Sequence, residues 1–144
     1  MPENILYVAG ATGYIGREVV KRALKRGYTV HASVRLNSKT ALPHHDRLIL
    51  DIIQTERAKT TFNIPRGASV ISCISSRTGT AQDAHNIDYQ MNVSLLDCAQ
   101  ASDAVVFLML SAICVQKPKL AFQHAKLKFE DALQTSGLKY SIVR

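Results

Sequence analysis

A glycine-rich loop near the start of the chain has the residue types and the spacing that hold a pyrophosphate. It follows the apolar run at residues 5–9 directly and leads into an amphipathic stretch at residues 17–26. In a strand–turn–helix unit of this kind, glycines let the backbone approach the phosphate oxygens, and free N–H groups of the helix start face the anion. We also expect the Thr12 side chain to cap the helix. The predicted cofactor-binding residues of this loop are Gly10, Thr12, Gly13, Tyr14, Ile15 and Gly16.

An arginine stands where an acidic residue would select NAD. In NAD-binding folds, an Asp or Glu about 20 residues after the first glycine binds the ribose 2′-hydroxyl. This chain has no acidic residue between Glu18 and Asp46, and its second apolar run ends at Arg35, with Ser38 close behind. A guanidinium can bind an anionic 2′-phosphate through two parallel hydrogen bonds. The pattern favours NADP(H) over NAD(H), and a solvated loop charge is the alternative interpretation of Arg35.

Apolar runs that alternate with helical patterns must position these residues. We expect strands over residues 5–9, 28–34, 47–51, 68–74, 104–110 and 139–143, and helices over 14–26, 86–101 and 119–136, with a weaker helix around 54–60. This alternation predicts an α/β fold, a doubly wound parallel sheet with right-handed crossovers, which is the Rossmann fold for NAD(P). We expect the 144 residues, 1–144, to form one domain.

Ligands of such a sheet lie beyond the carboxyl ends of its strands. The side chains that the predicted strand ends bring there are Asp51, Cys73, Ile74, Ser75 and Ser111. Asp51 ends the third strand, where it is placed to reach the adenine. Lys126 lies on the following helix, one turn after Phe122. Core packing of Phe122 and a solvated charge at Lys126 are the alternatives for these two positions.

The composition limits the classes of partner. The formal net charge is +7, but the basic residues are scattered and no arginine-rich run with interleaved aromatics occurs, so we expect no nucleic acid. Cys73, Cys98 and Cys114 lack metal-site spacing and are expected to be reduced thiols. The adjacent histidines 44 and 45 lack partner ligands, so no metal is expected. The most apolar stretch, residues 104–115, is too short to span a bilayer.

Several longer runs carry a resemblance to known reductases. The loop GATGYIG resembles the short-chain dehydrogenase/reductase superfamily, in its extended and atypical, NmrA-like branches. The more particular runs are SCISSRTG at 72–79, IDYQ at 87–90, LSAICVQKP at 110–118, FQHAKLKFE at 122–130 and YSIVR at 140–144. Together they resemble the NADPH-dependent divinyl (proto)chlorophyllide 8-vinyl reductases of chlorophyll biosynthesis. The resemblance covers essentially the whole chain, and the SAICVQKP run is its most specific part.

The resemblance implies roles for individual residues. The three glycines of the loop would hold the pyrophosphate, Arg35 the 2′-phosphate, and Lys126 the nicotinamide ribose. The superfamily's YxxxK pattern has a tyrosine that protonates a carbonyl oxygen, and here that position is Phe122. This departure argues against alcohol or ketone chemistry and fits hydride transfer to a carbon–carbon double bond, with a tetrapyrrole of the divinyl chlorophyllide type as the substrate. Ser111 and Cys114 are candidate proton donors by position.

The resemblance also implies a substrate-binding part that follows the last strand in the family, and we expect this chain to lack it. It implies a cytoplasmic location in a bacterium, or the plastid stroma or thylakoid surface in a phototrophic eukaryote. Peripheral membrane association and the oligomeric state stay open. Two alternative functions are a non-catalytic NADP(H)-binding regulatory or assembly module, and another atypical reductase acting on a quinone or a conjugated alkene.

Overall fold

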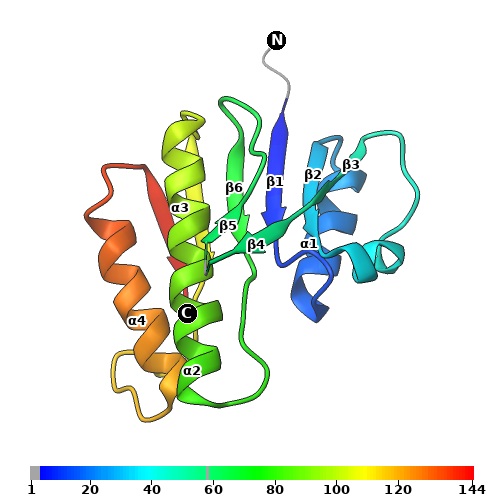
Figure 1. Ribbon diagram of the computed structural model, residues 1–144. Coiled ribbons are helices and arrows are strands. Elements are labelled where there is room, and N and C mark those ends of the chain that lie inside the picture. Colours follow the sequence, from blue (N-terminus) through cyan, green and yellow to red (C-terminus); the bar gives the residue numbers. More distant parts are fainter. Residues whose placement is uncertain (1–3, 58) are drawn as a thin grey trace.

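Within residues 4–57 and 59–144, which the structure describes, this computed structural model contains a six-stranded sheet (Figure 1). Its strands are β1 (Ile5–Ala9), β2 (Thr29–Val34), β3 (Leu48–Ile52), β6 (Ser69–Ser72), β7 (Val106–Leu110) and β8 (Tyr140–Val143). The strand order is β3-β2-β1-β6-β7-β8, and every neighbouring pair is parallel. Strands are therefore added outward from β1 in one direction as far as β3 and then outward from β6 in the other direction, as in a doubly wound Rossmann sheet. The predicted α/β fold is confirmed.

Helices cover both faces of this sheet. They are α1 (Tyr14–Lys25), α2 (Ala81–Asp83), α3 (Asn92–Ala101) and α4 (Ala121–Gln134), with a 3₁₀ turn at Leu36–Ala41 and a π-helical segment at Ala84–Met91 that joins α2 to α3. Helix α1 packs on one face, and α3 and α4 pack on the other (Figure 1). Right-handed crossovers that run in opposite directions from β1 and β6 require this placement.

The alternation of side chains along β1 divides the core into two clusters. Tyr7 faces α3 and α4 and packs with Phe107 and Phe129. Val8 faces α1 and packs with Val20. Because both faces of a parallel sheet are covered, its central strands are apolar on both sides, which explains the continuous apolar runs in the sequence.

The weak helix expected around residues 54–60 is wrong. The segment forms a β-hairpin of β4 (Gln54–Glu56) and β5 (Lys59–Thr61), antiparallel, with the hydroxyls of Thr55 and Thr60 2.8 Å apart. Residue 58 lies outside the described residues. Threonines favour strands because their branched side chains suit a pleated surface. The backbone N–H of Thr60 also donates to the Ser94 hydroxyl, which fastens the hairpin to α3.

Candidate dinucleotide-binding site

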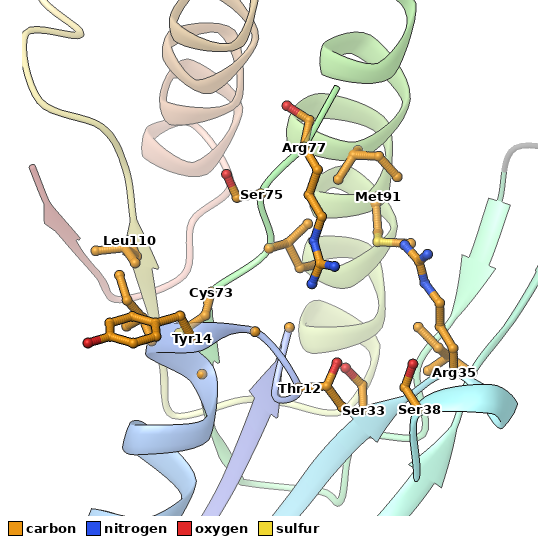
Figure 2. Close-up of a pocket in the computed structure, with 18 of the residues that line it drawn as sticks. Thr12, Tyr14, Ser33, Arg35, Ser38, Cys73, Ser75, Arg77, Met91 and Leu110 are labelled. Carbon is orange, nitrogen blue, oxygen red and sulfur yellow. The ribbon is translucent and has the colours of Figure 1, made fainter. Parts of the chain in front are cut away.

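A cavity of about 650 Å³ opens at the carboxyl ends of the central strands (Figure 2). The predicted site residues that line it are Gly10, Thr12, Gly13, Tyr14, Ile15, Gly16, Arg35, Cys73, Ile74, Ser75, Ser111 and Lys126. They come from the loop after β1 and the first turn of α1, the residue after β2, the segment after β6, the residue after β7 and helix α4. The structure thus brings together residues up to 116 positions apart in the sequence, as expected for a strand-switch crevice.

The three loop glycines are required for different reasons. Gly10 has φ +73°, and a Cβ on it would lie 2.6 Å from the Cys73 carbonyl. A Cβ on Gly16 would lie 2.0 Å from the Gly10 carbonyl oxygen, because α1 begins directly against the loop. Gly13 has room within the protein, since its nearest neighbour would be 3.4 Å away. Two of the glycines therefore shape the loop itself, and the third leaves open space beside it.

The expected Thr12 cap of α1 is wrong. The N-cap residue is Gly13, whose N–H bonds the Gly10 carbonyl at 3.2 Å, and no side chain of the described residues caps the helix. The turn that closes at Gly13 places the N-cap one residue beyond Thr12. The N–H groups of the first turn of α1 are consequently without a capping side chain at the edge of the cavity, where an anion can accept from them.

Asp51 is the one predicted cofactor-binding residue that the structure does not bring to the cavity. It is buried, and its carboxylate accepts from the Tyr7 hydroxyl and from the Asn63 N–H and side-chain amide, at 2.8 and 2.7 Å for the latter two. Burial and this bond raise the pKa of Tyr7. Asp51 therefore links β3 to β1 and to the segment after β5, and both of its carboxylate oxygens accept hydrogen bonds there.

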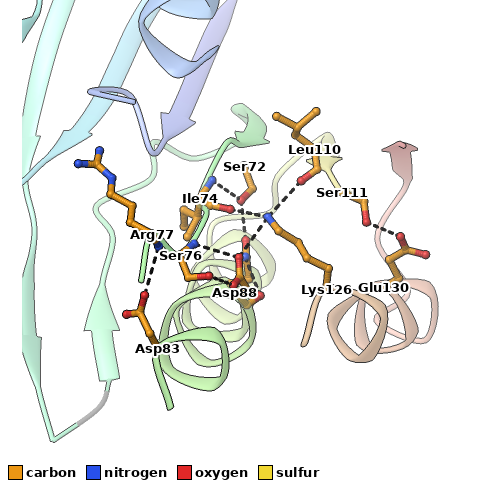
Figure 3. A network of polar contacts seen from close by, with 11 residues as sticks. Ser72, Ile74, Ser76, Arg77, Asp83, Asp88, Leu110, Ser111, Lys126 and Glu130 are labelled. Carbon is orange, nitrogen blue, oxygen red and sulfur yellow. Dashed lines mark hydrogen bonds and ion pairs between the residues drawn. The ribbon is translucent and has the colours of Figure 1, made fainter. Parts of the chain in front are cut away.

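Lys126 is 3% exposed and joins three separate segments (Figure 3). Its Nζ donates to the carbonyl oxygens of Ile74, at 2.5 Å, and Leu110, at 3.3 Å, and lies 3.6 Å from the Asp88 carboxylate. Burial lowers the pKa of Lys126, and the neighbouring Asp88 opposes that effect. An ammonium has three protons, and here three acceptors surround it. Lys126 therefore clamps the ends of β6 and β7 at the cavity wall.

Asp88 lies behind Lys126 and is a residue of the site's surroundings that was not predicted from the sequence, as Arg77 and Ser33 of the cavity lining were not. Asp88 is fully buried in the π-helical segment, and it accepts from both the N–H (3.1 Å) and the hydroxyl of Ser76 as well as facing Lys126. Asn92 donates to its carbonyl at 2.9 Å. π-Helical turns are frequent at functional sites. The available signal was an acid that stands with no other acidic residue and no Lys or Arg between Asp83 and Asp97.

Ser111 lines the cavity, but its hydroxyl proton is directed elsewhere. The hydroxyl donates to the buried Glu130 carboxylate at 2.5 Å, and Arg144 donates to the same carboxylate at 2.7 Å. Burial acts to raise the pKa of Glu130, but the bonds from Arg144 and Ser111 outweigh it and lower that pKa. Ser111 therefore presents its lone pairs, not its proton, to the cavity.

The other two residues considered for the chemistry lie outside the cavity lining. Phe122 is half-buried near the start of α4, and Cys114 is exposed in the loop before that helix. Neither side chain contacts the cavity that Lys126 and Ser111 line. The candidate proton donors suggested by sequence position are thus not presented to this cavity as donors.

Cys73 and Cys114 are expected to differ in reactivity. Burial raises the pKa of Cys73 to about 11, although Lys126 nearby acts to lower it. At pH 8 only about 0.1% of Cys73 is then thiolate, the form that is alkylated. We expect iodoacetamide at pH 8 to label the exposed Cys114 at least about tenfold faster than Cys73. Peptide mass spectrometry measures the two labelling rates. Equal labelling rates would contradict the raised pKa and the partly buried placement of Cys73.

A doubly wound sheet with a glycine-rich loop at its switch point, opening into a cavity of this size, defines a dinucleotide-binding protein. Residues 10–144 match the family model described as NAD(P)H-binding, and the chain belongs to this family. The expectation of a nicotinamide dinucleotide is thereby confirmed.

Curated relatives are similar over nearly the whole chain. Divinyl chlorophyllide a 8-vinyl-reductase of Arabidopsis thaliana is 40% identical, over 98% of this chain and 38% of that protein, and its counterpart in Cucumis sativus is 41% identical with the same coverage. Photosystem II assembly factor Ycf39 of Guillardia theta is 30% identical, over 94% of this chain and 44% of that protein. The chain thus spans about two fifths of the length of these relatives.

Solved structures confirm the fold alone. A UDP-galactose 4-epimerase superposes with a TM-score of 0.80 at 16% identity, over 97% of this chain and 55% of that one. The oxidoreductase ylbE of Lactococcus lactis gives 0.75 at 17% identity, over 97% of this chain and 68% of that one. Among the described residues, none of the helices is long and apolar enough to cross a membrane, and none of the acidic, His and Cys side chains gather in a group that could hold a metal.

Proposed function

We propose that the chain forms the NADPH-binding part of a reductase that converts the 8-vinyl group of divinyl chlorophyllide or protochlorophyllide to an ethyl group. The observation that carries this proposal is the pairing of a buried Lys126 at the cavity wall with Phe122 one turn earlier. The position thus offers a cation beside the cavity and no phenol. The relatives at 40 and 41% identity, which are named as such reductases and as chloroplastic, support both the substrate and a plastid location.

The residues present suit NADPH. Gly10 and Gly16 allow the close backbone contacts that the loop requires, and the open side of Gly13 leaves space for a pyrophosphate. The start of α1, which lacks a capping side chain, supplies N–H donors. Arg35 lines the cavity and makes no ion pair among the described residues, so its guanidinium is available to a 2′-phosphate. Lys126 would hold the nicotinamide ribose with an Nζ whose position Asp88 fixes.

NADPH, when bound, supplies a hydride, and a proton completes the reduction of the double bond. A vinyl group conjugated to a macrocycle can accept hydride because the ring delocalises the developing charge, so no oxygen needs protonation and no phenol is needed. The contribution of this chain is orientation and exclusion of water at the cofactor's side. Since the Ser111 proton is bound to Glu130, the proton comes from solvent or from outside the described cavity.

A non-catalytic NADP(H)-binding assembly module is the second candidate. It is favoured by the relative named as a photosystem II assembly factor and by Lys126, whose Nζ already donates to two backbone carbonyls and pairs with Asp88 within the protein. A reductase of a quinone or another conjugated alkene is the remaining alternative. These candidates share the cofactor site and differ in the reaction that the site supports.

A chimaera tests the proposal directly. The matched region of the Cucumis sativus reductase is replaced with residues 1–144 of this chain, and the product of divinyl chlorophyllide a with NADPH is followed by mass spectrometry. We expect a gain of two hydrogens at a rate within about tenfold of the unmodified enzyme, and no acceleration from Phe122→Tyr. A folded chimaera that binds NADPH but reduces only quinones, or nothing, would favour one of the alternatives. A large gain from Phe122→Tyr would mean that a proton donor was missing at that position.

A further inference from the structure

Two guanidiniums extend toward the same part of the cavity from different strand ends (Figure 2). Arg35 follows β2, and Arg77 lies in the segment after β6, so the two approach from opposite sides of β1. Within residues 4–57 and 59–144, neither guanidinium makes a hydrogen bond or an ion pair, whereas those of Arg66 and Arg144 do. The two positive charges repel each other, and an anion bound between them would offset this repulsion.

The backbone of Arg77 is held firmly although its side chain is exposed. The N–H of Arg77 donates to the Asp83 carboxylate at 3.2 Å (Figure 3). The N–H of Thr78 donates to the same carboxylate at 3.2 Å and the Thr78 hydroxyl at 3.0 Å. These bonds and the charge of Arg35 lower the pKa of Asp83. The nearby acid is thus already bound to the loop that presents Arg77. The loop is fixed and the guanidinium is left for a ligand.

Small hydroxyl side chains complete this part of the cavity. Thr12, Ser33 and Ser38 line it below the two arginines (Figure 2). A phosphate monoester has three terminal oxygens, which two guanidiniums and neighbouring hydroxyls can satisfy with charge-assisted bonds. A ribose hydroxyl at the same place would leave both positive charges unmatched. The arrangement therefore suits a phosphate dianion better than an uncharged ribose edge.

We propose that Arg77 is a second 2′-phosphate ligand, which closes on the phosphate opposite Arg35 and sets the preference for NADPH over NADH. This inference rests on the proposed function of the cavity as an NADPH site. It differs from a role in stacking on the adenine, which a guanidinium can also perform. Stacking would contribute equally to both dinucleotides, because they carry the same adenine.

Calorimetric titration with NADPH and with NADH tests the assignment in Arg77→Gln, Arg77→Lys and Arg35→Gln variants. Arg66→Gln is the matched control, because Arg66 is also exposed but pairs with Asp103 before the amino end of β6, outside the cavity. We expect Arg77→Gln to weaken NADPH binding about 10- to 100-fold and NADH binding less than about threefold, with Arg77→Lys intermediate because a lysine lacks the bidentate fork.

The outcomes separate this inference from the proposed function. Equal losses for NADPH and NADH in Arg77→Gln would overturn it in favour of adenine stacking, and unchanged NADPH binding would overturn it outright. If Arg66→Gln lost as much NADPH affinity as Arg77→Gln, the loss would be explained by the change in net charge alone, and the assignment of Arg77 would be overturned. If the unmodified chain binds neither dinucleotide nor adenosine 2′,5′-bisphosphate, the proposed function itself fails. If the unmodified chain prefers NADPH and Arg77→Gln keeps that preference, only the role of Arg77 fails.

Discussion

Replacing Gly16 with alanine is expected to lower the free energy of unfolding by about 3 kcal/mol or more, because the new methyl group collides with backbone. Its Cβ would lie 2.0 Å from the Gly10 carbonyl oxygen and 2.8 Å from the Gly10 carbonyl carbon. Neither atom belongs to a flexible side chain that can turn aside. Helix α1 must therefore move away from the loop, which separates the buried Val20 from its partners on β1 and β2. Urea denaturation measures this loss, and the displaced loop should no longer bind NADPH.

Gly13→Ala is the matched control for this prediction. Gly13 has φ −71°, which alanine adopts readily, and the nearest atom to its Cβ would be 3.4 Å away. We expect its free energy of unfolding to change by less than about 1 kcal/mol. NADPH affinity should nevertheless fall about tenfold, because the methyl group occupies space that the proposed pyrophosphate needs. A stable Gly16→Ala variant, or unaltered NADPH binding by Gly13→Ala, would contradict these different roles of the two glycines.

The features of the fold that the sequence predicts well are those with a local cause. Each strand of the sheet lies within two residues of its expected limits, because an apolar run covered on both faces is recognisable without its neighbours. The glycine loop is equally local, since Gly10 and Gly16 are demanded by contacts made within the same unit and with the adjoining strand end. The prediction of a helix over residues 54–60 fails because the segment is too short for its pattern of apolar residues to distinguish a helical turn from two threonine-rich strands.

The candidate site is less predictable because its polar partners are distant in sequence. Asp51 ends a strand at the correct edge of the sheet, yet Tyr7 and Asn63 take its carboxylate. Asp88 and Glu130 are buried acids on helices. Their partners that follow strands lie 12 to 19 positions away, and Asp88 also meets Lys126 of α4, 38 positions away. Periodicity places an acid on a helix but does not indicate which strand end it will meet. The sequence therefore predicts which residues gather at the cavity better than it predicts what each one contacts.

Lys126→Met is expected to destabilise the chain by about 3–5 kcal/mol, because it removes one partner of a buried ion pair. Asp88 would keep its bonds from Ser76 but lose its counter-charge, and the carbonyl oxygens of Ile74 and Leu110 would lose a donor. Lys128→Met is the matched control on the same helix: Lys128 is exposed and lies over the Tyr89 ring at 4.1 Å, so its loss should remove no more than about 1 kcal/mol.

A double variant separates the stability of this clamp from its role at the cofactor. Lys126→Met with Asp88→Asn removes both charges, so the free energy of unfolding should recover by about 1–3 kcal/mol relative to Lys126→Met alone. NADPH affinity should not recover with it, because the cation that would hold the nicotinamide ribose is still absent. Urea denaturation measures the free energy of unfolding and calorimetry measures NADPH affinity, both on the unmodified chain, Lys126→Met, Lys128→Met and the double variant. If affinity returns together with stability, Lys126 acts only by holding the ends of β6 and β7 in place, and its assignment to the ribose is wrong.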